Sequence, residues 1–146
     1  MNIPIMRPVT TSEFVEWMQR LADAWSRQDT EAALACFTTD AVYMEPPDVQ
    51  FFQGHDQLRA YFGALAPGIF MRFHGLWFDE TSQTGVGEFT FGNEKIETAD
   101  HGVVVVEFAG KRIAVWREYP RKGPADFDAF AGTAGKSWRW HIGNYP

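Results

Sequence analysis

One carboxyl group stands out in this sequence, that of Glu45, near the end of the segment TDAVYMEPP at residues 39–47. The β-branched and aromatic residues before it favour an extended backbone, and Pro46 and Pro47 end a strand because proline donates no ladder hydrogen bond. Side chains alternate along a strand, so Tyr43 and Glu45 share a face. If this face is the inner one, burial raises the pKa of Glu45 towards that of a general acid or base.

Arg117 is the cation that could accompany this carboxyl. It lies on a predicted strand over residues 113–119, whose aliphatic residues suggest that one alternating set points inward. The set predicted to point inward is Ile113, Val115, Arg117 and Tyr119, and the set predicted to point outward is Ala114, Trp116 and Glu118. A buried Arg117 needs an acceptor, and pairing with it would keep Glu45 ionised. A structural ion pair elsewhere is the alternative for Arg117.

His74 and Tyr43 are the candidate proton-transfer partners of Glu45. His74 lies on a predicted strand over residues 69–79, and an imidazole titrates near neutral pH. It exchanges a proton with Glu45 or Tyr43 if it points inward, and has no such role if it lies on the outer face. Tyr43 is alternatively a wall residue, and Glu45 a solvated acid at a strand end. His101 is expected at the surface or at a dimer edge.

The elements that must position these residues follow from periodicity. A capping box formed by Thr10 and Glu13 begins a helix with an aromatic stripe, and Asp29 is a good N-cap for a short helix over residues 30–37. A third helix is predicted from His55 to about Leu65. The strands that follow are predicted at residues 69–79, 86–92, 103–109 and 113–119. The aromatic residues expected to contact a substrate are Trp17, Trp25, Phe62 and Tyr119.

Helices followed by a run of mostly antiparallel strands predict an α+β domain with the helices on one face of the sheet. The 146 residues fit a single domain, residues 1–146. We expect its core at about residues 12–120 and a tail at residues 121–146. In that tail Trp138, Trp140 and Ile142 alternate, which predicts an added strand or an apolar flap.

Composition excludes several classes of partner. The net charge of −6 and the pI of about 5.1 argue against nucleic acid or an anionic membrane surface. The longest aliphatic run, residues 103–106, is far too short to cross a bilayer, and the N-terminal residues lack the apolar region of a signal peptide. Cys36 is the single cysteine, so no intrachain disulfide is possible. We therefore expect a cytoplasmic protein with neither nucleic acid nor membrane as a partner.

Neither a metal nor a cofactor is expected. The four histidines are scattered without ligand spacing, and Gly85-Val86-Gly87 lacks the third glycine of a dinucleotide fingerprint. A serine nucleophile with its base cannot be assembled from the motifs present. Acid–base chemistry on a small hydrophobic organic molecule, or binding of such a molecule without chemistry, therefore remains.

Three segments together resemble a known family. They are AWSRQDTEAALACFTTDAVYMEPP, FFQGHDQLRAYF and GVVVVEFAGKRIAVWREYP, and they resemble the nuclear transport factor 2-like superfamily, in particular its SnoaL-like branch. The resemblance covers about residues 14–119. It implies a cystatin-like, cone-shaped half-barrel whose curved sheet wraps the long helix around a deep apolar pocket, often in a homodimer.

Proteins of this fold differ in activity. They include ketosteroid isomerases, polyketide cyclases, scytalone dehydratases, limonene epoxide hydrolases and proteins without a known reaction, so the fold alone does not give the function. In the ketosteroid isomerases the catalytic carboxylate directly precedes the proline that ends the first strand, and Glu45 before Pro46 matches that place. The catalytic tyrosine of the isomerases has no counterpart here, since the matching position is about Leu21. The position of their second acid falls near Val104.

Two hypotheses from different classes follow. In the first, the protein is an isomerase, dehydratase or cyclase in which Glu45 is the general base or acid, with Tyr43, His74 and Arg117 assisting. In the second, it is a binding or dimerisation module without chemistry. The predicted outer sheet face is apolar, which favours a homodimer through that face. Its members are Val103, Val105, Ala114 and Trp116.

Overall fold

A computed structural model describes residues 7–132 of the chain. The helices are α1 (Thr11–Ser26), α2 (Thr30–Leu34), α3 (Gly54–Gly63) and α4 (Phe127–Ala131). The strands are β1 (Phe37–Met44), β2 (Phe51–Gln53), β3 (Ile69–Asp79), β4 (Thr84–Asn93), β5 (Thr98–Ala109) and β6 (Arg112–Pro124).

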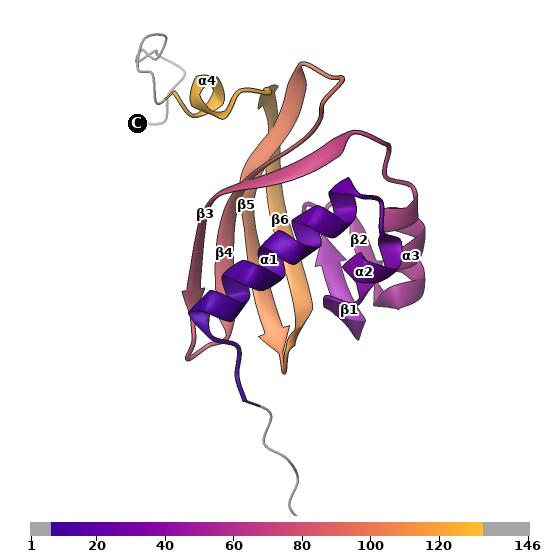
Figure 1. The fold of residues 1–146 in the computed structure, drawn as a ribbon, viewed down its shortest axis with the longest axis vertical. Coiled ribbons are helices and arrows are strands. Elements are labelled where there is room, and N and C mark those ends of the chain that lie inside the picture. Colours follow the sequence, from indigo (N-terminus) through magenta and orange to yellow (C-terminus); the bar gives the residue numbers. More distant parts are fainter. Residues whose placement is uncertain (1–6, 133–146) are drawn as a thin grey trace, which may run out of the picture.

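The strands form one curved sheet in the order β2-β1-β6-β5-β4-β3. Strands β1 and β6 pair in parallel, and the other neighbours pair antiparallel. Helix α1 crosses one face of the sheet, with α2 and α3 at the end of that helix nearest β1 (Figure 1). The α+β class predicted from the sequence is confirmed, and the inner face of the sheet is the one that carries the core and the candidate site.

The two N-terminal helices begin at the predicted caps. The Thr10 hydroxyl accepts the Glu13 N–H at 3.2 Å, and the Asp29 carboxylate accepts the Ala32 N–H at 3.1 Å. These side chains satisfy donors that the first helical turn leaves without a partner. The predicted stripe of α1 is buried at Phe14, Met18, Leu21, Ala22, Ala24 and Trp25. Helix α2 is shorter than predicted, because Phe37 already pairs with Ile113 of β6.

A bulge in β6 reverses the predicted faces of this strand. Ile113 pairs with Phe108 but Val115 pairs with Glu107, so one residue, Ala114, is extra on β6. An extra residue changes the parity of all residues that follow it. The prediction that Ile113 shares a face with Val115, Arg117 and Tyr119 is therefore wrong. Ile113 is on the inner face, and the other three are on the outer face. Trp116 and Glu118, predicted to point outward, are buried on the inner face at 0% and 4% exposure.

The segment after Glu45 forms a short strand that the sequence did not predict. Strand β2 pairs with the end of β1, with Phe52 opposite Tyr43. The Phe52 ring stacks on Tyr61 of α3 at 4.4 Å between centroids. This hairpin fixes the end of β1 against α3, and so places Glu45 beside Tyr61.

Within the described residues, no helix is long and apolar enough to cross a membrane. The predicted strand or flap at Trp138, Trp140 and Ile142 lies outside the described residues.

Packing of α1 on the sheet requires a glycine at residue 85. A Cβ built at Gly85 would lie 2.4 Å from Cζ of Phe14, whose ring stacks on Phe78. We expect Gly85→Ala to lower the free energy of unfolding by about 1–3 kcal/mol through overpacking, measured by urea denaturation. Gly63→Ala is the control, since the nearest atom lies 4.0 Å away. Equal stability of the two variants would contradict this account of the helix–sheet contact.

Candidate active site

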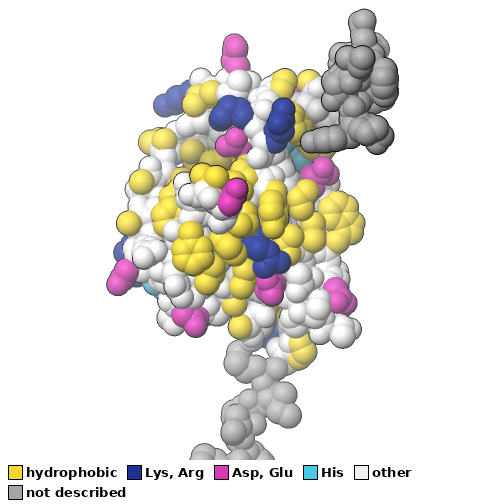
Figure 2. All heavy atoms as spheres, turned by 180° about the vertical axis from the view of Figure 1, so that it is seen from behind, with side chains coloured by type: hydrophobic (Ala, Val, Ile, Leu, Met, Phe, Trp, Pro, Cys, Tyr) yellow, Lys and Arg dark blue, Asp and Glu magenta, His cyan; other side chains and the backbone are white. Residues whose placement is uncertain are grey.

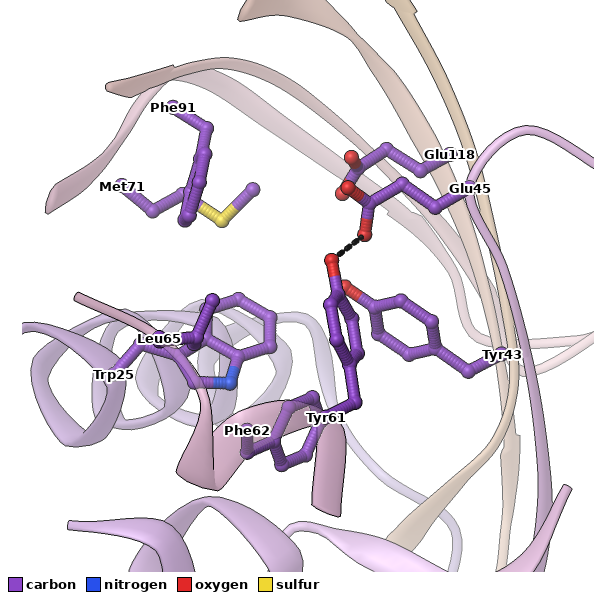
Figure 3. A pocket seen from close by; sticks show the side chains of 9 residues that line it. All are labelled: Trp25, Tyr43, Glu45, Tyr61, Phe62, Leu65, Met71, Phe91 and Glu118. Carbon is purple, nitrogen blue, oxygen red and sulfur yellow. Dashed lines mark hydrogen bonds between the residues drawn. The ribbon is translucent and has the colours of Figure 1, made fainter. Parts of the chain in front are cut away.

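Two carboxyl groups from neighbouring strands meet on the inner face of the sheet. Glu45 follows the last residue of β1, and Glu118 lies on β6, which pairs in parallel with β1. Their carboxyl groups lie side by side and point into the space between the sheet and α3 (Figure 3). Burial, and secondly the charge of Glu45, raise the pKa of Glu118 well above its usual value. Burial also raises the pKa of Glu45.

Hydrogen bonding distinguishes the two acids. The Tyr61 hydroxyl donates to Oε2 of Glu45 at 2.9 Å, and the Trp116 indole N–H donates to Oε1 of Glu118 at 3.1 Å. Hydrogen bonds from Tyr61, Tyr43 and Glu118 favour the ionised form of Glu45 and offset part of its burial. One arrangement satisfies all of these groups: Glu45 is ionised and accepts, while Glu118 is protonated and donates to Glu45. Of the two acids, Glu118 has the more strongly raised pKa and is the one that retains its proton to higher pH.

The carboxyl pair lines a small cavity with aromatic walls. The residues lining it are Trp25, Tyr43, Glu45, Tyr61, Phe62, Leu65, Met71, Phe91 and Glu118. The ring of Tyr43 stacks on Trp116 at 5.6 Å, and Trp25 packs edge-on against Phe62 and Trp116. The cavity volume is about 10 Å³, close to what one water molecule needs. An organic substrate can reach the carboxyl pair only if wall side chains move.

The wall also contains a donor without an acceptor. The indole Nε1 of Trp25 is buried and has no hydrogen-bond partner among the described residues. A buried donor left unsatisfied costs about 1–3 kcal/mol. Of the four aromatic residues predicted to contact a substrate, Trp25 and Phe62 line the cavity.

The structure places Arg117 away from this cavity. Arg117 lies on the outer face of β6, where it pairs with Glu107, and Tyr119 is half exposed on the same face. Of the two alternatives for Arg117, pairing with Glu45 is excluded, because the bulge at Ala114 turns Arg117 outward, and the structural ion pair elsewhere is the one found. Trp17 is also remote from the carboxyl pair. It lies in a surface hollow with Glu13 and Lys111, and Arg20 stacks over its ring.

His74 and His101 form a separate cluster on the outer face. His74 lies 2.6 Å from the Thr90 hydroxyl, which lies 2.8 Å from Nδ1 of His101. Nε2 of His101 donates to the carbonyl of Pro124 at 2.6 Å, and Phe127 of α4 stacks on His74. His74 is therefore not close to Glu45 or Tyr43. The prediction of a surface position for His101 is wrong: it is 1% exposed, because α4 covers it.

The sequence reasoning missed two site residues: Tyr61, which donates to Glu45 from α3, and Glu118. Simple alternation from Ile113 placed Glu118 outside, and no turn residue marks the bulge at Ala114. The one signal was Trp116, two residues before Glu118 and therefore on its face. A tryptophan on a solvated sheet face is unusual, so its presence argued for the opposite parity.

No three histidine, cysteine, aspartate or glutamate side chains in residues 7–132 are grouped so that they could hold a metal ion. The polar groups at the cavity are carboxyl, phenol and indole groups. This set can transfer protons and donate hydrogen bonds to an oxygen atom.

Comparison with known proteins identifies the family. A SnoaL-like domain matches residues 18–116, more than half of the chain. The chain belongs to the SnoaL-like domain family. No curated protein matches it. The resemblance to the nuclear transport factor 2-like superfamily predicted from the sequence is confirmed.

Solved structures with the same fold support the assignment. A protein of unknown function with a cystatin-like fold from Methylobium petroleophilum PM1 is 19% identical, with a TM-score of 0.70 over 96% of this chain and 99% of that one. An LEH-like epoxide hydrolase from M. tuberculosis is 18% identical, with a TM-score of 0.64 over 76% and 84%. A putative ketosteroid isomerase from Kribbella flavida DSM 17836 is 13% identical, with a TM-score of 0.66 over 91% and 93%. Identities this low establish the fold alone.

The raised pKa of Glu118 links folding to pH. Above about pH 4.5 an unfolded chain releases the Glu118 proton while the folded protein retains it, so stability falls as pH rises, by at most about 1.4 kcal/mol per pH unit. Between pH 5 and pH 8 the free energy of unfolding of the wild type should therefore fall more than that of Glu118→Gln. The difference in slope should be at most about 1.4 kcal/mol per pH unit. Thermal melts in matched buffers measure it.

The exposed Glu16 on α1 provides the control for this experiment. Glu16→Gln removes a carboxyl group without removing a buried one, so its pH dependence should match that of the wild type. A wild-type and a Glu118→Gln protein with the same pH dependence would contradict the assignment of a buried, protonated Glu118.

Proposed function

We propose that this protein is a cofactor-independent acid–base enzyme for a small hydrophobic substrate with a carbonyl, hydroxyl or epoxide oxygen. The observation that carries the proposal is the carboxyl pair: Glu45 and Glu118 lie side by side and face one small cavity, and burial raises the pKa of Glu118 further than that of Glu45. Two carboxyl groups whose surroundings separate their pKa values form a base and an acid at the same pH. Isomerisation, dehydration and cyclisation all need such a pair.

Each side chain has a defined role in this proposal. Glu45 removes a proton from the substrate, and Tyr61 holds its carboxylate in place by the 2.9 Å hydrogen bond. Glu118 donates a hydrogen bond or its proton to the substrate oxygen on which negative charge develops. Tyr43 and Phe62 form the apolar wall beside the reacting group.

The members of the fold named as an epoxide hydrolase and a putative ketosteroid isomerase are compatible with this chemistry. Both names refer to reactions in which acid–base groups act on an apolar molecule. The second acid here lies on β6, whereas Val104, where the isomerase resemblance expects it, is a buried apolar residue. The proposal therefore rests on the residues of this chain.

A second candidate function is ligand binding without turnover. The small cavity favours it, because about 10 Å³ next to the carboxyl pair leaves no room for an organic molecule in this conformation. The two candidates differ in what Glu45 does. In a binding protein its carboxylate contributes to affinity and no product forms.

Loss of the base should abolish turnover. We expect Glu45→Gln to lower kcat by about a hundredfold or more, since general-base catalysis contributes roughly 10²–10⁴ in rate. The assay follows solvent deuterium incorporation and product formation with three probes: a β,γ-unsaturated cyclic ketone, a β-hydroxy ketone and a cyclic epoxide. Glu107→Gln is the control, because it removes a carboxylate on the outer face. Equal turnover by wild type and Glu45→Gln would eliminate the enzyme hypothesis.

We also propose that the protein is a homodimer through the outer sheet face. Hydrophobic side chains gather on this face around a few charges (Figure 2). Val103, Trp77 and Tyr119 are 37%, 59% and 50% exposed there. Trp116, predicted as part of this surface, is buried on the inner side and does not belong to it. Large exposed apolar patches are typical of protein interfaces.

A charge in the centre of this face should separate the subunits. We expect Val103→Asp to convert a dimer into a monomer, because an unpaired carboxylate would be buried in the interface. Val49→Asp is the matched control, since Val49 is 77% exposed in the connection between β1 and β2. Sedimentation equilibrium measures the mass. A monomeric wild type would refute the proposal.

A further inference from the structure

A second, larger hollow adjoins the cavity of the carboxyl pair. Its volume is about 260 Å³, and its walls come from the α3–β3 connection, the start of β3, the β4–β5 connection, and β4, β5 and β6. Phe91 lines both spaces. The inner cavity holds about one water molecule, whereas the outer hollow approaches the roughly 300 Å³ at which small-ligand sites begin. The outer hollow therefore has room for most of a small organic molecule, and the inner cavity does not.

Strand register places the outer hollow in line with the carboxyl pair. Phe91 pairs with Asp100, and Asp100 pairs with Lys122. Because side chains alternate, Lys122 shares the inner face of β6 with Glu118. Four residues of strand separate these two positions, a distance of about 13 Å. The two spaces thus follow one another along the inner face of the sheet, with Phe91 between them, and we call them together the trough: the carboxyl pair lies at one end and Asp100 with Lys122 at the other.

The charges at the outer end are loosely paired. The Lys122 ammonium lies 3.5 Å from the Asp100 carboxylate, and the two side chains are 68% and 35% exposed. Such a pair contributes little to stability, so a competing cation can replace Lys122 at small cost. Burial is the main reason that the pKa values of Glu45 and Glu118 are raised, and the charge of Asp100 adds to it. The whole trough is therefore negative in character.

We propose that the outer hollow is a substrate subsite in which Asp100 binds the ammonium group of an amphiphilic amine. The proposal rests on the proposed function, because it names the class of molecule that the carboxyl pair acts on. The apolar part of the amine lies against Phe91 and Ile96, and its reacting oxygen extends past Phe91 to Glu45 and Glu118. Asp100 is the specificity-determining residue, and it takes no part in the chemical step.

The charge balance favours an amine over an acid. A carboxylate in the outer hollow would meet Asp100 and, further along the trough, the ionised Glu45, with the solvated Lys122 as its partner. An ammonium group gains the attraction of Asp100, and Lys122 is released to water, where it is already two-thirds exposed. A neutral alcohol of the same shape gains neither and provides the baseline.

Three probes of equal length test the subsite: phenylbutylamine, phenylbutanol and phenylbutanoate. Binding is followed by NMR of isoleucine methyl groups, since Ile69 and Ile96 line the hollow and Ile113 lies near the opposite end of β6. We expect the amine to shift the signals of Ile69 and Ile96 but not that of Ile113. Its dissociation constant should be about two- to fivefold below those of the other two probes, as an exposed ion pair contributes.

Substitutions assign the preference to Asp100. Asp100→Asn should remove the advantage of the amine, and Asp23→Asn, which removes the same charge from an exposed position of α1, should preserve it. Lys122→Gln should tighten amine binding about threefold, because the internal competitor is gone. Thermal melts establish that the variants are folded.

The outcomes separate this inference from the proposed function. An amine advantage that survives Asp100→Asn, or that is absent from the wild type, overturns the subsite whatever the turnover assay gives. Turnover unaffected by Glu45→Gln overturns the acid–base reaction and leaves the binding preference untouched, since the NMR experiment needs no product.

Discussion

The hydrogen-bonded pair of Glu45 and Glu118 depends on one backbone irregularity, the extra residue at Ala114. Without it, the parity of β6 would place Arg117 on the inner face and Glu118 in solvent. The bulge exchanges a cation for a carboxyl group at the point where β6 lies beside the end of β1. One inserted residue thus puts a second carboxyl group, in place of an arginine, beside Glu45.

The surrounding packing keeps this costly arrangement in place. Trp116 is fully buried, stacks on Tyr43, and donates its indole N–H to Glu118, so the same side chain supplies both core packing and a hydrogen bond. Tyr61 does the same for Glu45 from α3, and Phe52 of β2 stacks on its ring. A buried acid held by aromatic donors is destabilising at neutral pH, and sites that retain such groups are candidates for function.

The same inner face explains both the small cavity and the hollow beside it. Near the carboxyl pair large aromatic rings fill the space between α1, α3 and the sheet. Towards the end of β4 and the start of β5, beyond the reach of α1, the walls carry smaller side chains and the space widens. Phe91 stands between the two, so the position of one ring decides how far a molecule in the hollow can reach.

The sequence alone predicts the α+β class and the helix caps at Thr10 and Asp29, because these follow from local periodicity and capping chemistry, and it puts Tyr43 and Glu45 on one face without deciding whether that face is the inner one. It did not determine the partner of Glu45. Parity is a property of the whole strand, and the bulge at Ala114 arises from pairing with β5, a contact that no local pattern encodes. The burial of His101 was likewise decided by α4, which covers the outer face from a distant part of the chain. Tertiary contacts alone brought Glu118 to Glu45, since the two residues lie on strands that are far apart in the sequence and adjacent in the sheet.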